Sequence, residues 1–157
     1  MGAPETAHVA FGLASLALGV GVFSLPKGQN VHRAVGALYV LSMVGLNVTA
    51  LAIYRVFGGF GVFHVLALIN LALLLAGFGA VLLQGPHNTG LDYHYYFMCW
   101  SYVGLVAATA TEVTVRVVKW PLAFAVLVPT ISVTILGGSL VQFLKRRTML
   151  RVTSRLQ

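Results

Sequence analysis

The chain has 157 residues, of which 59% are hydrophobic and 8% are charged. Soluble domains carry roughly 25% charged residues, so this composition excludes a soluble globular protein and predicts an all-α, polytopic membrane protein. The formal net charge of +7 comes from basic residues that flank the apolar stretches, and we therefore expect no nucleic-acid binding.

Five apolar stretches are each long enough to cross a bilayer, which takes about 20 residues in a helix. In chain order they cover residues 5–25, 31–55, 61–84, 92–115 and 121–144. The connections between them are short. We therefore expect five transmembrane helices in one integral membrane domain (residues 1–157), with the first four forming a four-helix bundle and the fifth flanking it.

A basic tail, residues 145–157, follows the fifth stretch. Its Lys and Arg residues are Lys145, Arg146, Arg147, Arg151 and Arg155. Basic residues next to a span mark the cytoplasmic side of the membrane. The tail thus predicts a cytoplasmic C-terminus and, with five spans, an N-terminus outside. The lipid bilayer is the expected partner of the spans.

Four of the five histidines stand at the start of successive apolar stretches: His8, His32, His64 and His94. Because the chain crosses back and forth, His8 and His64 are expected near the outer face, and His32 and His94 near the inner face. The positive end of a helix disfavours a protonated imidazole, and neutral imidazole is the form that binds a metal. The two pairs predict two b-type haems, each with two histidine ligands to the iron.

Two glycines lie on the same helix faces as these histidines. Gly12 follows His8 by four residues, and Gly36 follows His32 by four, which places each glycine one turn from its histidine. A small residue beside a ligand leaves room for a flat porphyrin. Small residues also let membrane helices approach closely, so helix packing is the alternative explanation for both glycines.

Three functions remain open. The first is transmembrane electron transfer through the two haems, with a redox protein or a quinone as partner. The second is a zinc-dependent membrane hydrolase that uses His8, His64 and Glu112, since catalytic zinc takes three protein ligands and a water. The third is a non-enzymatic scaffold, assembly factor or small permease. Homo-oligomers are compatible with all three.

Two further pairs of polar residues are expected to interact within the membrane. Glu112 precedes Arg116 by four residues, a spacing that supports an ion pair on one helix. Asn47 and Asn70 are expected at similar depth on neighbouring helices, where a hydrogen bond between them would contribute about 0.6–2 kcal/mol.

Three segments carry a resemblance to a known family. They are Lys27-Gly28 followed by HRAVGALYVLSMVGLNVTA (32–50), FGGFGVFHVLALINLALLLAG (57–77), and HYYFMCWSYVGLVAATATEVTVR (94–116). The pattern resembles a family of small bacterial multi-helix membrane proteins of unknown function, which implies a bacterial inner-membrane location. The histidine layout is also similar to that of transmembrane di-haem b cytochromes, which implies haem b as the cofactor.

Overall fold

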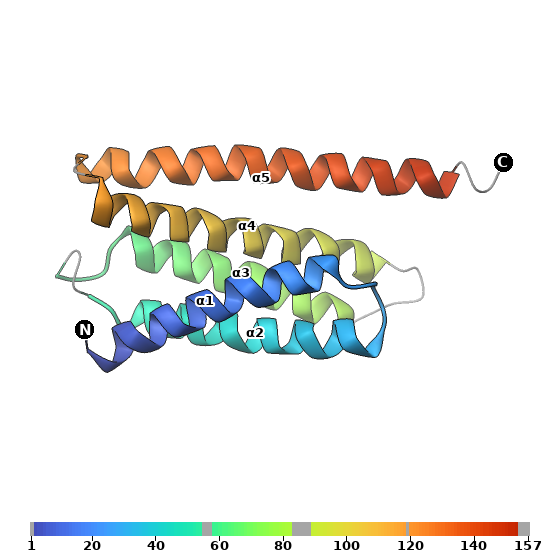
Figure 1. The fold of residues 1–157 in the computed structure, drawn as a ribbon, viewed down its shortest axis with the longest axis horizontal. Coiled ribbons are helices and arrows are strands. Elements are labelled where there is room, and N and C mark those ends of the chain that lie inside the picture. Colours follow the sequence, from blue (N-terminus) through green and yellow to red (C-terminus); the bar gives the residue numbers. More distant parts are fainter. Residues whose placement is uncertain (1, 55–57, 83–88, 119, 154–157) are drawn as a thin grey trace. The chain divides into compact units, whose positions relative to one another are not determined.

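The computed structural model describes residues 2–54, 58–82, 89–118 and 120–153. Every regular element in these residues is an α-helix, as the sequence predicts. In chain order the helices are α1 (Ala3–Ser24), α2 (Asn30–Leu51), α3 (Val62–Leu82), α4 (Thr89–Val117) and α5 (Leu122–Thr153), shown in Figure 1. Their bounds match the predicted stretches to within a few residues, except that α5 continues into the basic tail.

The turn between α1 and α2 is built by a lysine and a glycine. The Lys27 Nζ donates hydrogen bonds to the carbonyls of Val22 (2.7 Å) and Phe23 (3.0 Å), two of the acceptors that the end of a helix leaves unpaired. Gly28 has a φ of +82°, a left-handed conformation that glycine adopts without steric cost. The chain can therefore reverse within a few residues.

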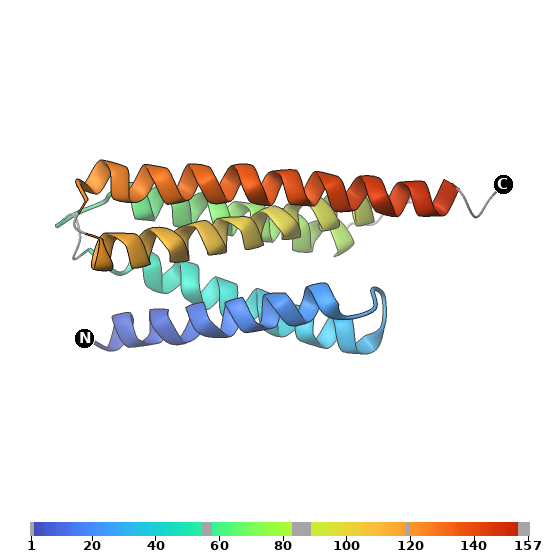
Figure 2. The same cartoon turned by 45° about the horizontal axis from the view of Figure 1, so that its top comes forward.

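The helices fall into two compact units, Met1–Leu105 and Val106–Gln157. The first unit contains α1, α2, α3 and the first part of α4, and the second contains the rest of α4 and α5. Within the first unit, α2 packs against both α1 and α3 and runs antiparallel to each (Figure 2). The expected bundle of four helices with α5 at its flank stays a prediction.

The core of the first unit is apolar and draws on three helices. Its buried cluster consists of Tyr39, Met43 and Leu46 from α2, Leu74 from α3 and Leu105 from α4. Apolar burial drives helix association weakly in a membrane, where lipid tails are as apolar as leucine. Close contact between the helices therefore contributes most to their association.

Two glycines permit that close contact. A Cβ added at Gly19 would lie 2.1 Å from Cε2 of Tyr102, and one at Gly45 would lie 2.8 Å from Cε1 of Phe11. Both distances are shorter than real Cβ atoms show, so neither position accepts a side chain without movement. Glycine at these positions lets the helix backbones approach, as is common among membrane helices.

The second unit is joined by a hydroxyl pair. The Oγ1 atoms of Thr111 on α4 and Thr130 on α5 are 3.1 Å apart. Since the Thr130 hydroxyl already donates to the Val126 carbonyl at 2.7 Å, Thr111 is the donor between the two threonines. This bond joins α4 and α5 within the second unit.

The outer surfaces of both units are apolar. Leu13, Leu41 and Ile69 in the first unit are each more than half exposed, as are Ile135 and Leu136 in the second. Exposed apolar surface of this extent marks a protein or membrane contact. Together with the helix lengths, it supports a protein whose solvent is lipid.

Four helical segments have both the length and the apolarity of a membrane span among the described residues: α1, α2, α3 and Leu122–Lys145 of α5. The prediction of five spans is therefore supported for four. The exception, α4, contains Tyr93, His94 and Tyr95 in its first turns and Glu112 and Arg116 near its end, which lowers its mean hydropathy. The orientation of the termini depends on the number of spans and stays a prediction.

Candidate functional site

His94 lies in the second turn of α4 and is held by the backbone of α3. Its Nδ1 is 2.8 Å from the carbonyl oxygen of Gly77. A carbonyl only accepts hydrogen bonds, so Nδ1 carries the proton in this contact. A neutral His94 then has its lone pair on Nε2, the arrangement found in metal-ligating histidines that donate their other N–H to a backbone carbonyl.

His32 lies in the first turn of α2. Lys27 and His94 are near enough to act electrostatically on its ring. The buried Nδ1 atom has no hydrogen-bond partner within the described part of the chain. His94 thus has one ring nitrogen on a backbone carbonyl, and His32, its electrostatic neighbour, has a buried nitrogen without a partner among the described residues.

Lys27 lies near His32, although the sequence analysis named it only as part of the family resemblance. Its ammonium lies 5.9 Å from the centroid of the Phe23 ring and is an electrostatic neighbour of His32 and Cys99. Partial burial lowers the pKa of Lys27 below its ordinary value, and Cys99 opposes that shift. A basic residue five positions before a helix-opening histidine was the available signal in the sequence.

His64 differs from His94 in the nitrogen that is protonated. The backbone N–H of Gly61 donates to its Nδ1 at 3.0 Å, so a neutral His64 carries its proton on Nε2. The side chain is 2% exposed, and its ring stacks on Tyr54 and Phe60 with centroid distances of 4.8 and 5.0 Å. In this arrangement Nε2 is a hydrogen-bond donor and offers no lone pair to a metal.

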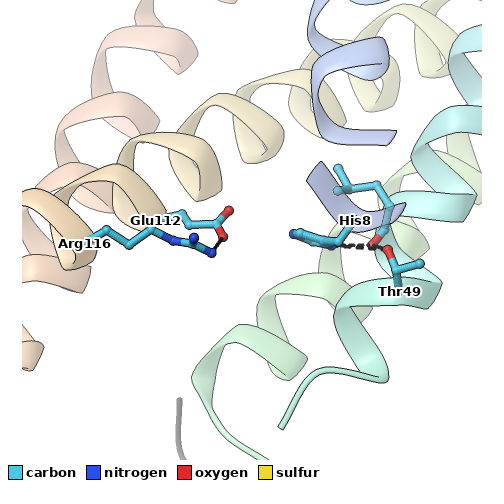
Figure 3. A network of polar contacts seen from close by, with 5 residues as sticks. His8, Thr49, Glu112 and Arg116 are labelled. Atoms are coloured by element: carbon cyan, nitrogen blue, oxygen red, sulfur yellow. Dashed lines mark hydrogen bonds and ion pairs between the residues drawn. The ribbon is translucent and has the colours of Figure 1, made fainter. Parts of the chain in front are cut away.

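His8 contacts α2. Its Nδ1 is 3.2 Å from both the carbonyl oxygen of Leu46 and the Oγ1 of Thr49, as Figure 3 shows for Thr49. The Thr49 hydroxyl itself donates to backbone carbonyls of its own helix. These contacts tie the start of α1 to the end of α2. Pairing of His8 with His64 on one iron stays a prediction. The tautomer of His64, with its proton on Nε2, opposes it.

The two predicted cofactor glycines differ in their surroundings. A Cβ at Gly36 would meet no atom within 4 Å, whereas one at Gly12 would lie 3.6 Å from Cδ1 of Leu46. Gly12 therefore packs against α2, in line with the helix-packing explanation. Gly36 leaves open space one turn from His32, where the haem prediction needs it.

Glu112 forms the expected ion pair with Arg116 on α4 (Figure 3). Both side chains are more than one-third exposed, so the pair contributes little to stability. Glu112 belongs to the second unit, and His8 and His64 belong to the first. Among the residues that the structure describes, no group of three His, Cys, Asp or Glu side chains is arranged to hold a metal ion.

A family model described as "Predicted membrane protein (DUF2306)" matches residues 6–145. The chain belongs to this family. No curated protein and no solved structure matches the chain. The region matched by the DUF2306 model includes all four helix-opening histidines and Glu112, so the candidate site lies wholly within the family domain.

The interior of this DUF2306 chain contains further polar contacts. The hydroxyl of Tyr39 lies 3.2 Å from the Oγ of Ser101, and both residues are buried. The Asn47 side-chain amide donates to the Met43 carbonyl of its own helix at 2.7 Å. Asn70 Oδ1 has no partner within the described residues, so the expected hydrogen bond between Asn47 and Asn70 is not formed through this oxygen.

Proposed function

We propose that this membrane protein is a b-type cytochrome-like electron carrier, with haem b held between His32 and His94. One observation carries the proposal: the Gly77 carbonyl engages Nδ1 of His94 and leaves Nε2 for a ligand, and His32 nearby has a buried Nδ1 without a partner among the described residues. Backbone carbonyls fix the tautomer and ring orientation of metal-ligating histidines in this way. Bundles commonly hold cofactors with ligands from facing helices.

Two features near the histidines support a bound porphyrin. A Cβ at Gly36 would meet no atom within 4 Å, so no side chain crowds this side of His32, and the Lys27 ammonium, an electrostatic neighbour of His32, is suited to pair with propionate groups. Bound haem would supply one-electron redox chemistry. The chain would contribute two nitrogen ligands, an apolar shell and a positive charge, which are the features that set the potential of such a centre.

The full form of the proposal has a second haem at His8 and His64, for transfer across the membrane. The protonated Nε2 of His64 favours the form with one haem. We further propose a bacterial inner-membrane location with the N-terminus outside, and a redox protein or quinone as the partner that exchanges electrons. A homo-oligomer is compatible with either form.

The test is the absorption spectrum of the protein after expression with added haem and purification in detergent. We expect a Soret band and, after dithionite reduction, the sharp α band of a b-type centre with two histidine ligands. His32→Ala and His94→Ala should each abolish these bands. His64→Ala is the matched control, because it removes a helix-opening histidine whose Nε2 is protonated.

The outcomes separate the alternatives. An unchanged spectrum in His64→Ala supports one haem, and loss of half the absorbance supports two. Absence of a Soret band from the folded wild-type protein would overturn the proposal, as would full absorbance in both His32→Ala and His94→Ala. Stoichiometric zinc in elemental analysis of that haem-free protein would favour the hydrolase instead.

A further inference from the structure

The last turns of α5 extend beyond the membrane-spanning part of that helix. The span covers Leu122–Lys145, whereas the helix continues without a break to Thr153 (Figure 1). The span is about 36 Å long, which is enough to cross a hydrocarbon core of about 30 Å. At its start Trp120 is half exposed, as is typical of tryptophan at a membrane interface. Residues 146–153 therefore continue α5 into the headgroup layer at the opposite interface.

This helical extension, residues 146–153, holds basic residues at defined depths. Along the helix axis, Arg146 and Arg147 follow Lys145 within about 3 Å, and Arg151 follows it by about 9 Å. The headgroup layer on each side of a bilayer is about 5–8 Å thick. The first two arginines are thus at the depth of the lipid phosphates, and Arg151 is at the aqueous edge of that layer.

The acidic residue of the second unit lies at the other end of α5. Within residues 106–157 the sequence contains one acidic residue, Glu112, and it forms an ion pair with Arg116 near the end of α4. Because α4 leads into the start of α5, about 35 Å of helix separates this end from Lys145. The groups that neutralise the arginines of the extension therefore come from outside the second unit.

We propose that the helical extension binds the phosphate groups of anionic phospholipids in the membrane that α5 spans. The planar guanidinium of arginine matches phosphate oxygens. Each basic residue next to a span strengthens the attraction of anionic lipid about fivefold. Lipid is favoured over a soluble acidic protein, because such a protein would have to displace headgroups to reach Arg146 and Arg147. This binding goes beyond the proposed electron transfer and does not depend on it.

The test is native mass spectrometry of the full-length protein in detergent with equal amounts of phosphatidylglycerol and phosphatidylcholine of the same acyl chains. We expect the wild type to retain the anionic lipid about tenfold or more in preference. Joint replacement of Arg146, Arg147 and Arg151 by glutamine should remove most of this preference. The matched control replaces the same three residues by lysine, which keeps the charge and should keep the preference.

A salt series on the wild type tests the same interaction without any variant. Raising ammonium acetate from about 50 to 500 mM should reduce the preference, because salt screens charges outside the hydrocarbon core. Two results would overturn the proposal: equal retention of the two lipids by the wild type, or an undiminished preference in the glutamine variant. Neither measurement needs a cofactor, so failure here leaves the haem proposal intact.

Discussion

Replacement of Gly19 by alanine should destabilise the first unit, because α1 is in close contact with Tyr102. The added Cβ would lie 2.1 Å from Cε2 of Tyr102, whereas carbon atoms in contact are about 3.5–4.0 Å apart. The ring must therefore retreat by about 1.5 Å, which also strains the 3.3 Å hydrogen bond from its hydroxyl to the Leu16 carbonyl.

The size of the effect follows from two opposed contributions. Overpacking of this kind costs about 1–3 kcal/mol, and the better helix propensity of alanine returns up to about 1 kcal/mol. We expect Gly19→Ala to lower the free energy of unfolding by about 1–2 kcal/mol, close to a tenfold change in the unfolding equilibrium. Denaturant titration in mixed micelles, followed by tryptophan fluorescence, measures it.

The control is Gly79→Ala on α3, where a Cβ would meet no atom within 4 Å. This variant should be neutral or slightly stabilised. In a Tyr102→Leu background, Gly19→Ala should lose most of its cost, since the ring that it strikes is absent. Equal stabilities of Gly19→Ala and Gly79→Ala, or an undiminished cost in the double variant, would refute the packing argument.

Two further predictions concern polar contacts. Thr111→Val and Thr130→Val each break the hydroxyl pair of the second unit and should each cost about 0.6–2 kcal/mol in the same titration, with a double variant no worse than the sum of the two. Lys27→Met removes the cation that donates to the last carbonyls of α1, and we expect a loss of about 0.5–1 kcal/mol. An unchanged midpoint in Lys27→Met would show that water replaces the lysine at no cost.

The all-α class and the membrane spans could be predicted from the sequence because both depend on local sums over about 20 residues. Hydropathy and length identified α1, α2 and α3 with bounds close to those observed, and α5 with its start but not its continuation into the basic tail. The same reasoning overstated α4, whose aromatic and charged residues reduce its apolarity. The ion pair of Glu112 and Arg116 was also predictable, since its spacing within one helix fixes the geometry.

The state of each histidine was decided by the tertiary structure. All four occupy equivalent positions in the sequence, yet the Gly77 carbonyl from α3 places the proton of His94 on Nδ1, and the Gly61 amide places that of His64 on Nε2. The two glycines beside His8 and His32 also differ only in the tertiary structure. Helix packing fills the space beside Gly12 and leaves the space beside Gly36 open. Sequence spacing determines which face of a helix a residue occupies, but the groups opposite that face come from distant parts of the chain.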